Sequence, residues 1–252
     1  MAREIEALRR GMRVLDLLGE QGPIGLSELA RRASLPKATV LRVLVTLAAT
    51  GHARQVLADG RWEARAAPAR TGEAPSRLAA VAGPVLDRLC AEMLWPSDIG
   101  VFERGAMRVL ETSRRRSPFV INRDVMGARI HVMFSAMGRA ILAGLDDDGR
   151  AALVVSLRRD GDPRDQAACT DAAVERLVAE TRARGYAVRE TGYYATTRSE
   201  GGVSAIALPV MSGGRAIAAV NLCWVTGAIP ADAVRSTYLP RLRAAAAEIA
   251  RA

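Results

Sequence analysis

The order of apolar and polar residues predicts a compact helical region at the start of the chain. Apolar residues recur at helical spacing over residues 4–20, in a stripe formed by Leu8, Met12, Leu15 and Leu18. Two more helices are predicted over residues 28–33 and 37–49, with Ser27 as the cap of the first and Ser34-Leu35-Pro36 as the turn between them.

A short hairpin is predicted directly after these helices. Ala58-Asp59-Gly60 separates two β-like runs at residues 52–57 and 61–65, and an Asp-Gly pair suits a tight turn. Three helices followed by a hairpin are the layout of a winged helix-turn-helix. We therefore predict such a domain over residues 1–66, followed by a linker and a linker helix over residues 67–93.

The rest of the chain, residues 94–252, predicts an α+β domain. Strands are expected over residues 98–103, 108–113, 186–190, 203–211 and 216–225, and helices over residues 134–145, 148–158, 171–184 and 231–251. Clusters of strands broken by helices favour a mainly antiparallel sheet.

Charge and composition narrow the possible functions. The net charge is +9, and the first 70 of the 252 residues carry 12 basic and 7 acidic side chains. This excess favours a polyanionic partner, although charge alone does not separate DNA from an anionic membrane surface. The longest uncharged stretch, residues 216–231, is too short and too broken by Asn221, Gly227 and Pro230 to predict a membrane span.

The scarce reactive residues argue against an enzyme or a metalloprotein. Lys37 is the only lysine, and the two histidines, His52 and His131, have no neighbours at metal-ligand spacing, so we predict neither a metal nor a cofactor. The three cysteines lie far apart and no signal peptide is apparent, which fits a reducing cytoplasm.

The third predicted helix has the features of a DNA-recognition helix. Val40, Leu44 and Leu47 form its inward stripe. The DNA-binding candidates in and around it are Ser27, Lys37, Ala38, Thr39, Arg42, Thr46 and, in the hairpin, Arg61. The alternative is an ordinary amphipathic surface helix.

Four segments, in order, resemble the IclR family of transcription regulators. They are GPIGLSELARRASLPKATVLRVLVTLAATGHAR (22–54), GARIHVMFSAMGRAILAGL (127–145), RARGYAV (182–188) and GVSAIALPVMSGGRAIAAVNL (202–222). The resemblance implies a winged helix-turn-helix joined to a GAF-like effector domain, and a homodimer or tetramer on an operator in double-stranded DNA. SAMGRAILA and NLCW are most similar to the branch that controls hydroxyphenylpropionate degradation.

The resemblance also implies where a small organic acid, aromatic or keto, would bind. Ser135, Ala136 and Met137 match the family's effector loop, and Ala205, Asn221 and Cys223 match pocket-facing strand positions. The N–H groups of Ala136 and Met137 open a helix and can bind a carboxylate. Met133 and Phe134 are candidates for an apolar wall, and Arg129 and Arg198 for a carboxylate partner.

Two other functions stay open at this point. An enzyme that acts on a small organic acid is one, although the chain shows no nucleophile and base pair. An architectural DNA-binding protein without a ligand is the other. A regulator without catalysis, controlling a catabolic operon, is the favoured prediction.

Overall fold

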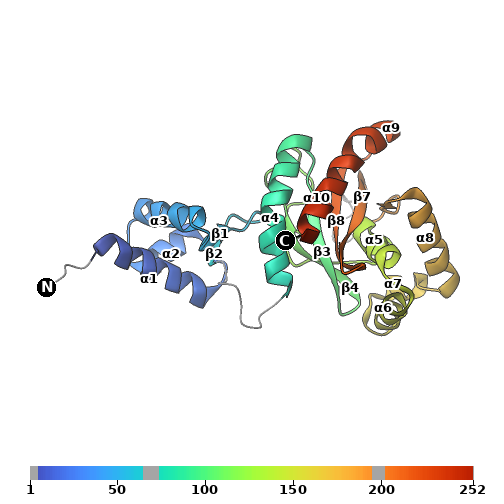
Figure 1. The fold of residues 1–252 in the computed structure, drawn as a ribbon, viewed down its shortest axis with the longest axis horizontal. Coiled ribbons are helices and arrows are strands. Elements are labelled where there is room, and N and C mark those ends of the chain that lie inside the picture. Colours follow the sequence, from blue (N-terminus) through green and yellow to red (C-terminus); the bar gives the residue numbers. More distant parts are fainter. Residues whose placement is uncertain (1–4, 65–73, 195–201, 252) are drawn as a thin grey trace. The chain divides into compact units, whose positions relative to one another are not determined.

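The computed structural model describes residues 5–64, 74–194 and 202–251. By its contacts, the chain divides into two compact units, Met1–Ala80 and Val81–Ala252, and each has a hydrophobic core of its own. The N-terminal unit contains α1 (Glu6–Gln21), α2 (Leu26–Ala33), α3 (Lys37–Ala49), β1 (Ala53–Gln55) and β2 (Trp62–Ala64) (Figure 1).

The N-terminal unit is a winged helix-turn-helix. Strands β1 and β2 pair antiparallel, with Gln55 opposite Trp62. Their turn uses Gly60 at φ +74°, as expected from the Asp-Gly pair. Ile24, between α1 and α2, exchanges two backbone hydrogen bonds with Trp62 and so ties the hairpin to the helices.

Two expectations for this unit were wrong. Of the predicted apolar stripe of α1, Leu8 and Met12 are exposed, while Leu18 is buried; Val14, outside the stripe, is also buried, and Leu17 packs against the same core. Ser27 does not cap α2: the helix already begins at Leu26, its N-cap is Gly25, and no side chain caps it. The backbone pairing of Ile24 with Trp62 fixes the chain just before Gly25. The first turn of α2 therefore starts at Leu26, one residue before Ser27.

The C-terminal unit is built on a six-stranded antiparallel sheet with the order β5-β4-β3-β8-β7-β6. The strands are β3 (Asp98–Glu103), β4 (Ala106–Thr112), β5 (Arg129–Ile130), β6 (Ala187–Val188), β7 (Val203–Ser212) and β8 (Arg215–Val225). The predicted α+β class with a mainly antiparallel sheet is therefore confirmed.

Helices cover both faces of this sheet. In Figure 1, α4 and α10 lie on one side of it and α5 to α8 on the other. The helices are α4 (Ala74–Met93), α5 (Ala136–Gly144), α6 (Asp147–Asp160), α7 (Pro163–Ala168), α8 (Asp171–Arg184), α9 (Ala231–Ala233) and α10 (Leu239–Arg251). Arg88 pairs with Glu248, and Arg241 lies 2.5 Å from Glu92, so two ion pairs join α4 to α10.

The last predicted helix, residues 231–251, is interrupted. A π-helical turn, η2 (Val234–Tyr238), separates α9 from α10, and Pro240 is the second residue of α10. Proline has no N–H and cannot continue the regular helical ladder, so the wider turn accommodates it. Strand β5 and helix α7 were not predicted; both are too short for a periodic pattern.

Candidate DNA interface and effector site

Helix α3 presents most of the predicted DNA-binding residues to solvent. Val40 and Leu44 are fully buried, while Lys37, Ala38, Arg42 and Thr46 are exposed. Thr39 is half-buried. The Thr46 hydroxyl donates to the Arg42 carbonyl at 2.9 Å, so its oxygen faces its own helix.

The start of α3 offers free hydrogen-bond donors. Its N-cap is Pro36, with no side-chain cap, and within the described residues the N–H groups of Lys37, Ala38 and Thr39 have no partner. Free N–H groups at the positive end of a helix dipole suit a phosphate.

The two flanking candidates are also exposed. Ser27 lies in the first turn of α2, and Arg61 lies in the hairpin, where its Nε is 2.5 Å from the Asp59 carboxylate. Arg61 would have to exchange this partner for a DNA phosphate.

In the C-terminal unit, the turn before α5 is held rigidly. The Ser135 hydroxyl caps the helix by accepting from the Gly138 N–H at 3.0 Å. The buried Asp165 carboxylate accepts from the Val132 and Met133 N–H groups at 2.7 and 2.9 Å. Burial raises the pKa of Asp165, although these two donors act in the opposite direction.

Gly138 allows the turn to approach the helix. A Cβ at this position would lie 2.3 Å from the carbonyl oxygen of Val132, a contact that no side chain tolerates. The N–H groups of Ala136 and Met137 remain without a hydrogen-bond partner in the described part of the chain.

A cavity of about 30 Å³ lies at this helix start, with charged and apolar walls. Its polar lining comes from Asp98, Arg114, Ser135, Arg189, Tyr193 and Asn221, and its apolar lining from Val109, Val125, Ala128, Ile130, Ala136, Met137 and Ala205.

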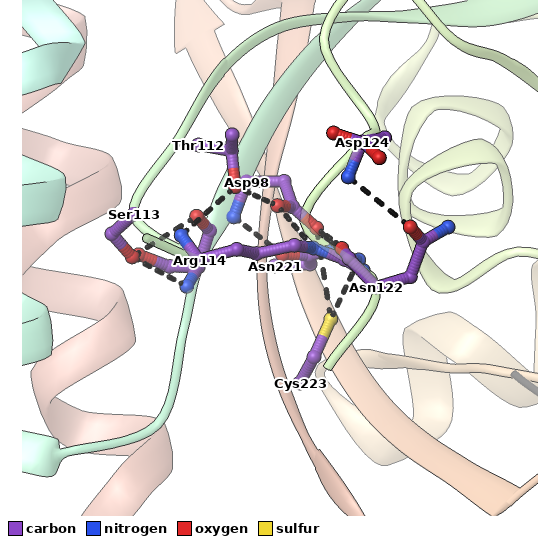
Figure 2. A network of polar contacts seen from close by, with 9 residues as sticks. Asp98, Thr112, Ser113, Arg114, Asn122, Asp124, Asn221 and Cys223 are labelled. Carbon is purple, nitrogen blue, oxygen red and sulfur yellow. Dashed lines mark hydrogen bonds and ion pairs between the residues drawn. The ribbon is translucent and has the colours of Figure 1, made fainter. Parts of the chain in front are cut away.

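Two of the lining residues, Asp98 and Arg114, form a buried ion pair, which Figure 2 shows with its hydrogen-bond partners. The Arg114 guanidinium donates to both carboxylate oxygens of Asp98, each at 2.9 Å. The Thr112 hydroxyl donates to the same carboxylate at 2.6 Å. Asn221 uses both ends of its amide on Asp98: its nitrogen donates to the carboxylate at 3.0 Å, and its oxygen accepts from the Asp98 backbone N–H at 2.7 Å.

These contacts set the charge states of the wall. Burial alone would raise the pKa of Asp98, but the Arg114 charge and the hydrogen bonds outweigh it and lower the pKa below its ordinary value. Burial, with the nearby Asp98 carboxylate, raises the pKa of the Cys223 thiol to about 12, so this cysteine is a neutral, unreactive thiol.

The structure brings together some of the predicted effector residues and not others. Ser135, Ala136, Met137, Ala205 and Asn221 line the cavity. Cys223 lies behind it, against Asp98.

Met133 and Phe134 do not line the cavity, contrary to our expectation. Met133 is buried in the core, and Phe134 stacks on Tyr193 outside the cavity. Arg129 contacts the backbone of the turn at residues 103–104 instead of the cavity. Arg198 lies outside the described residues.

The cavity contains functional candidates that the sequence interpretation missed. Arg189 reaches it from the residue after β6, and its guanidinium donates to the Tyr193 carbonyl at 2.6 Å. Strand alternation could have identified Arg189 from the sequence. Residues two apart in a strand face the same side of the sheet, so Arg189 faces the same side as the buried Ala187. No local pattern pointed to Asp98 or Arg114.

No helix within the described ranges has the length and apolar character that crossing a bilayer requires. Among the same residues, no three His, Cys, Asp or Glu side chains gather into a possible metal site.

One unit that is a winged helix-turn-helix and a second, α+β unit with a small polar and apolar cavity are the two parts of a transcription regulator with a separate sensor domain. Residues 7–57 match the IclR helix-turn-helix domain, and residues 75–251 match the bacterial transcriptional regulator IclR C-terminal domain. The chain therefore belongs to the IclR family of transcriptional regulators, which are not enzymes.

Individual relatives agree with this assignment. The chain is 26% identical to the Pca regulon regulatory protein of Pseudomonas putida, over 96% of this chain and 82% of that protein. It is 33% identical to the HTH-type transcriptional regulator BhcR of Paracoccus denitrificans, over 73% and 66%. Its fold is similar to an IclR homolog from Microbacterium hydrocarbonoxydans in complex with 4-hydroxybenzoate, with a TM-score of 0.53, 24% identity and 98% of each chain covered.

Proposed function

We propose that this regulator changes its affinity for operator DNA when a small aromatic acid binds at the start of α5, and that it controls an operon for the catabolism of that acid. One observation carries the proposal: the cavity combines a cationic side chain and an apolar wall with N–H groups at a helix start that have no partner among residues 5–64, 74–194 and 202–251. A carboxylate on a hydrophobic ring needs all three.

Each part of the cavity suits one part of such a ligand. The Ala136 and Met137 N–H groups and the Arg189 guanidinium are donors for a carboxylate. Val109, Val125 and Ile130 supply the apolar wall. The complex of the Microbacterium homolog with 4-hydroxybenzoate supports an aromatic acid over a keto acid.

The cavity is too small for an aromatic ring, so a ligand can enter only if the domain changes its conformation. A volume of about 30 Å³ accommodates one or two water molecules, whereas pockets for organic ligands measure roughly 300 Å³ or more. Tyr193, which is 1% exposed and lines the cavity, must move to admit a ring. Its hydroxyl accepts from the His131 N–H at 3.0 Å and its carbonyl contacts Arg189, so ligand binding disturbs the turn before α5.

The ligand therefore favours an open arrangement of this domain. It alters DNA binding only to the extent that the two arrangements differ in operator affinity. A coupling of about 1–3 kcal/mol would change operator affinity roughly 5- to 150-fold.

Calorimetry of the full chain tests the site, with 4-hydroxybenzoate, 3-hydroxyphenylpropionate and pyruvate as probes. The variant Ala136→Pro removes one donor at the first helical residue, a position where proline is well tolerated. We expect it to weaken aromatic-acid binding roughly tenfold or more, the value of a hydrogen bond to a charged group. Asp147→Pro, the same change at the first residue of α6, is the matched control.

Binding of an aromatic acid that Ala136→Pro weakens and Asp147→Pro leaves unchanged would support the site. Binding unaffected by Ala136→Pro and by Arg189→Ala would contradict it. A chain that binds duplex DNA but none of the acids would be an architectural protein.

We also propose that the regulator acts as a homodimer. One recognition helix reads only a few base pairs, too few to select an operator in a genome. Helix α1 and its N-cap residue carry an exposed apolar stripe of Ile5, Leu8 and Met12, which are 67%, 61% and 51% exposed. A second copy of this chain would bury the stripe, since residues at this spacing share one side of a helix.

A further inference from the structure

We infer that Leu41 and Val45 of α3 read the methyl groups of thymine in the major groove and so determine part of the operator sequence. The inference rests on DNA binding through α3. It identifies which chemical feature of the bases this helix recognises.

Both side chains lie on the outer side of α3. Leu41 is 42% exposed and Val45 is 56% exposed, whereas Val40 and Leu44 are fully buried. Because Leu41 and Val45 are four residues apart, they lie one above the other on the same side of the helix. The exposed Arg42 lies beside them.

The charges and hydrogen-bond donors around Leu41 and Val45 favour nucleic acid over a second copy of the helix as the binding partner. Lys37 is one turn before Leu41, and α3 contains two cations and no acidic residue. The N–H groups of Lys37, Ala38 and Thr39 are unpartnered within the described residues. A surface with cations and free donors is complementary to a polyanion, and pairing it with a second α3 would bring like charges together.

The major groove offers one apolar group to such a surface. Thymine carries a C5-methyl group, and the other base edges in this groove present hydrogen-bond donors and acceptors. Four helical residues rise about 6 Å, which is close to two base-pair steps of about 3.4 Å each. Leu41 and Val45 can therefore each contact a different thymine, while Arg42 reaches a neighbouring base or phosphate.

Uracil substitution tests this contact directly, because uracil keeps the hydrogen-bonding edge of thymine and lacks only its methyl group. The full chain first selects a tight-binding duplex from a random pool. Each thymine of that duplex is then replaced by uracil in turn, and binding is measured by fluorescence anisotropy. Loss of one buried methyl should weaken binding by about fourfold, which we call the uracil penalty. Two thymines in the stretch of DNA contacted by one α3 helix should show this penalty.

The variants assign each position to one side chain. In Leu41→Ala, the uracil penalty should vanish at one position and persist at the other, and in Val45→Ala the pattern should be reversed. Val155→Ala, which shortens a valine on α6 that is 62% exposed, should retain both penalties. The two variants alter exposed positions, so their folding should be unchanged.

Several results would overturn the inference. Uracil substitution without effect at every position would show that the methyl groups are not read, while leaving DNA binding by the family's domain intact. Penalties that persist in both alanine variants would assign the methyl contact to another part of the protein. A fall in oligomeric state in either variant, with no change in the uracil penalty, would make this face a contact between copies. Failure to select any duplex would instead contradict DNA binding itself.

Discussion

Removing the buried carboxylate of Asp98 should destabilise the C-terminal unit more than any surface change. In Asp98→Ala, the Arg114 side chain, only 8% exposed, loses a bidentate carboxylate partner but stays buried. Breaking a buried pair by deleting one partner costs about 3–5 kcal/mol, mainly because the remaining charge is desolvated without compensation. For a unit of this size, that corresponds to a fall in melting temperature of roughly 6–20 °C.

Scanning calorimetry of the full chain measures this loss, and two variants make the result specific. Asp124→Ala removes a carboxylate whose side chain is 90% exposed and lies 3.7 Å from Arg115, and it should cost less than about 1 kcal/mol. The double variant Asp98→Ala/Arg114→Met removes the buried cation as well and should recover at least half of the loss. A small effect in Asp98→Ala, or no recovery in the double variant, would refute the reasoning.

The same pair predicts a dependence of stability on pH. Because the folded-state pKa of Asp98 is below its ordinary value of 3.8, the unfolded chain takes up this proton first as the pH falls. The stabilisation is complete above that ordinary value and is lost as the pH falls through the lower folded-state pKa. The gap in stability between the wild type and Asp98→Ala should therefore be constant near neutrality and narrow below about pH 4; a gap that widens on acidification would contradict this sign.

Three further predictions concern DNA binding, assembly and the turn before α5. Lys37→Ala should weaken binding to all duplexes alike and reduce the salt slope by about one, whereas Arg42→Ala should also reduce discrimination between sequences; anisotropy at several salt concentrations separates the two. Leu8→Glu should convert dimers to monomers in sedimentation at micromolar concentration, and unchanged dimers would exclude the α1 stripe as the contact. Gly138→Ala should push the turn away from Val132 and lower both the melting temperature and acid affinity; unchanged values would show that the turn can adjust.

Local patterns were sufficient for the helices and for the face that meets DNA. Val40 and Leu44 were predicted inward from spacing alone, because a helix has one period and a recognition helix has a single buried stripe. The Asp-Gly turn was also visible in the sequence, because it depends on neighbouring residues only. The helix predicted to begin at residue 134 begins two residues later, at Ala136, after the Ser135 cap. These features and the family resemblance led to the correct fold class.

Periodicity left open which stripe of a helix is buried when apolar residues occur on several sides. In α1, only Leu18 of the predicted stripe is fully buried, and packing against α2 and α3 buries Val14 in place of Leu8 and Met12. The Phe134 side chain likewise packs where a long-range contact places it, stacked on Tyr193, which is 59 positions further along the chain.

The wall of the cavity depends on the tertiary structure alone. Asp98 meets Arg114 across 16 residues and Asn221 across 123, and the antiparallel pairing of β3 with β4 and β8 brings them together. The sequence places Asn221 in an apolar strand, where a buried amide must be hydrogen-bonded. Only the sheet order determined that this partner is Asp98, since a strand's neighbours are set by long-range packing and leave no trace in local spacing.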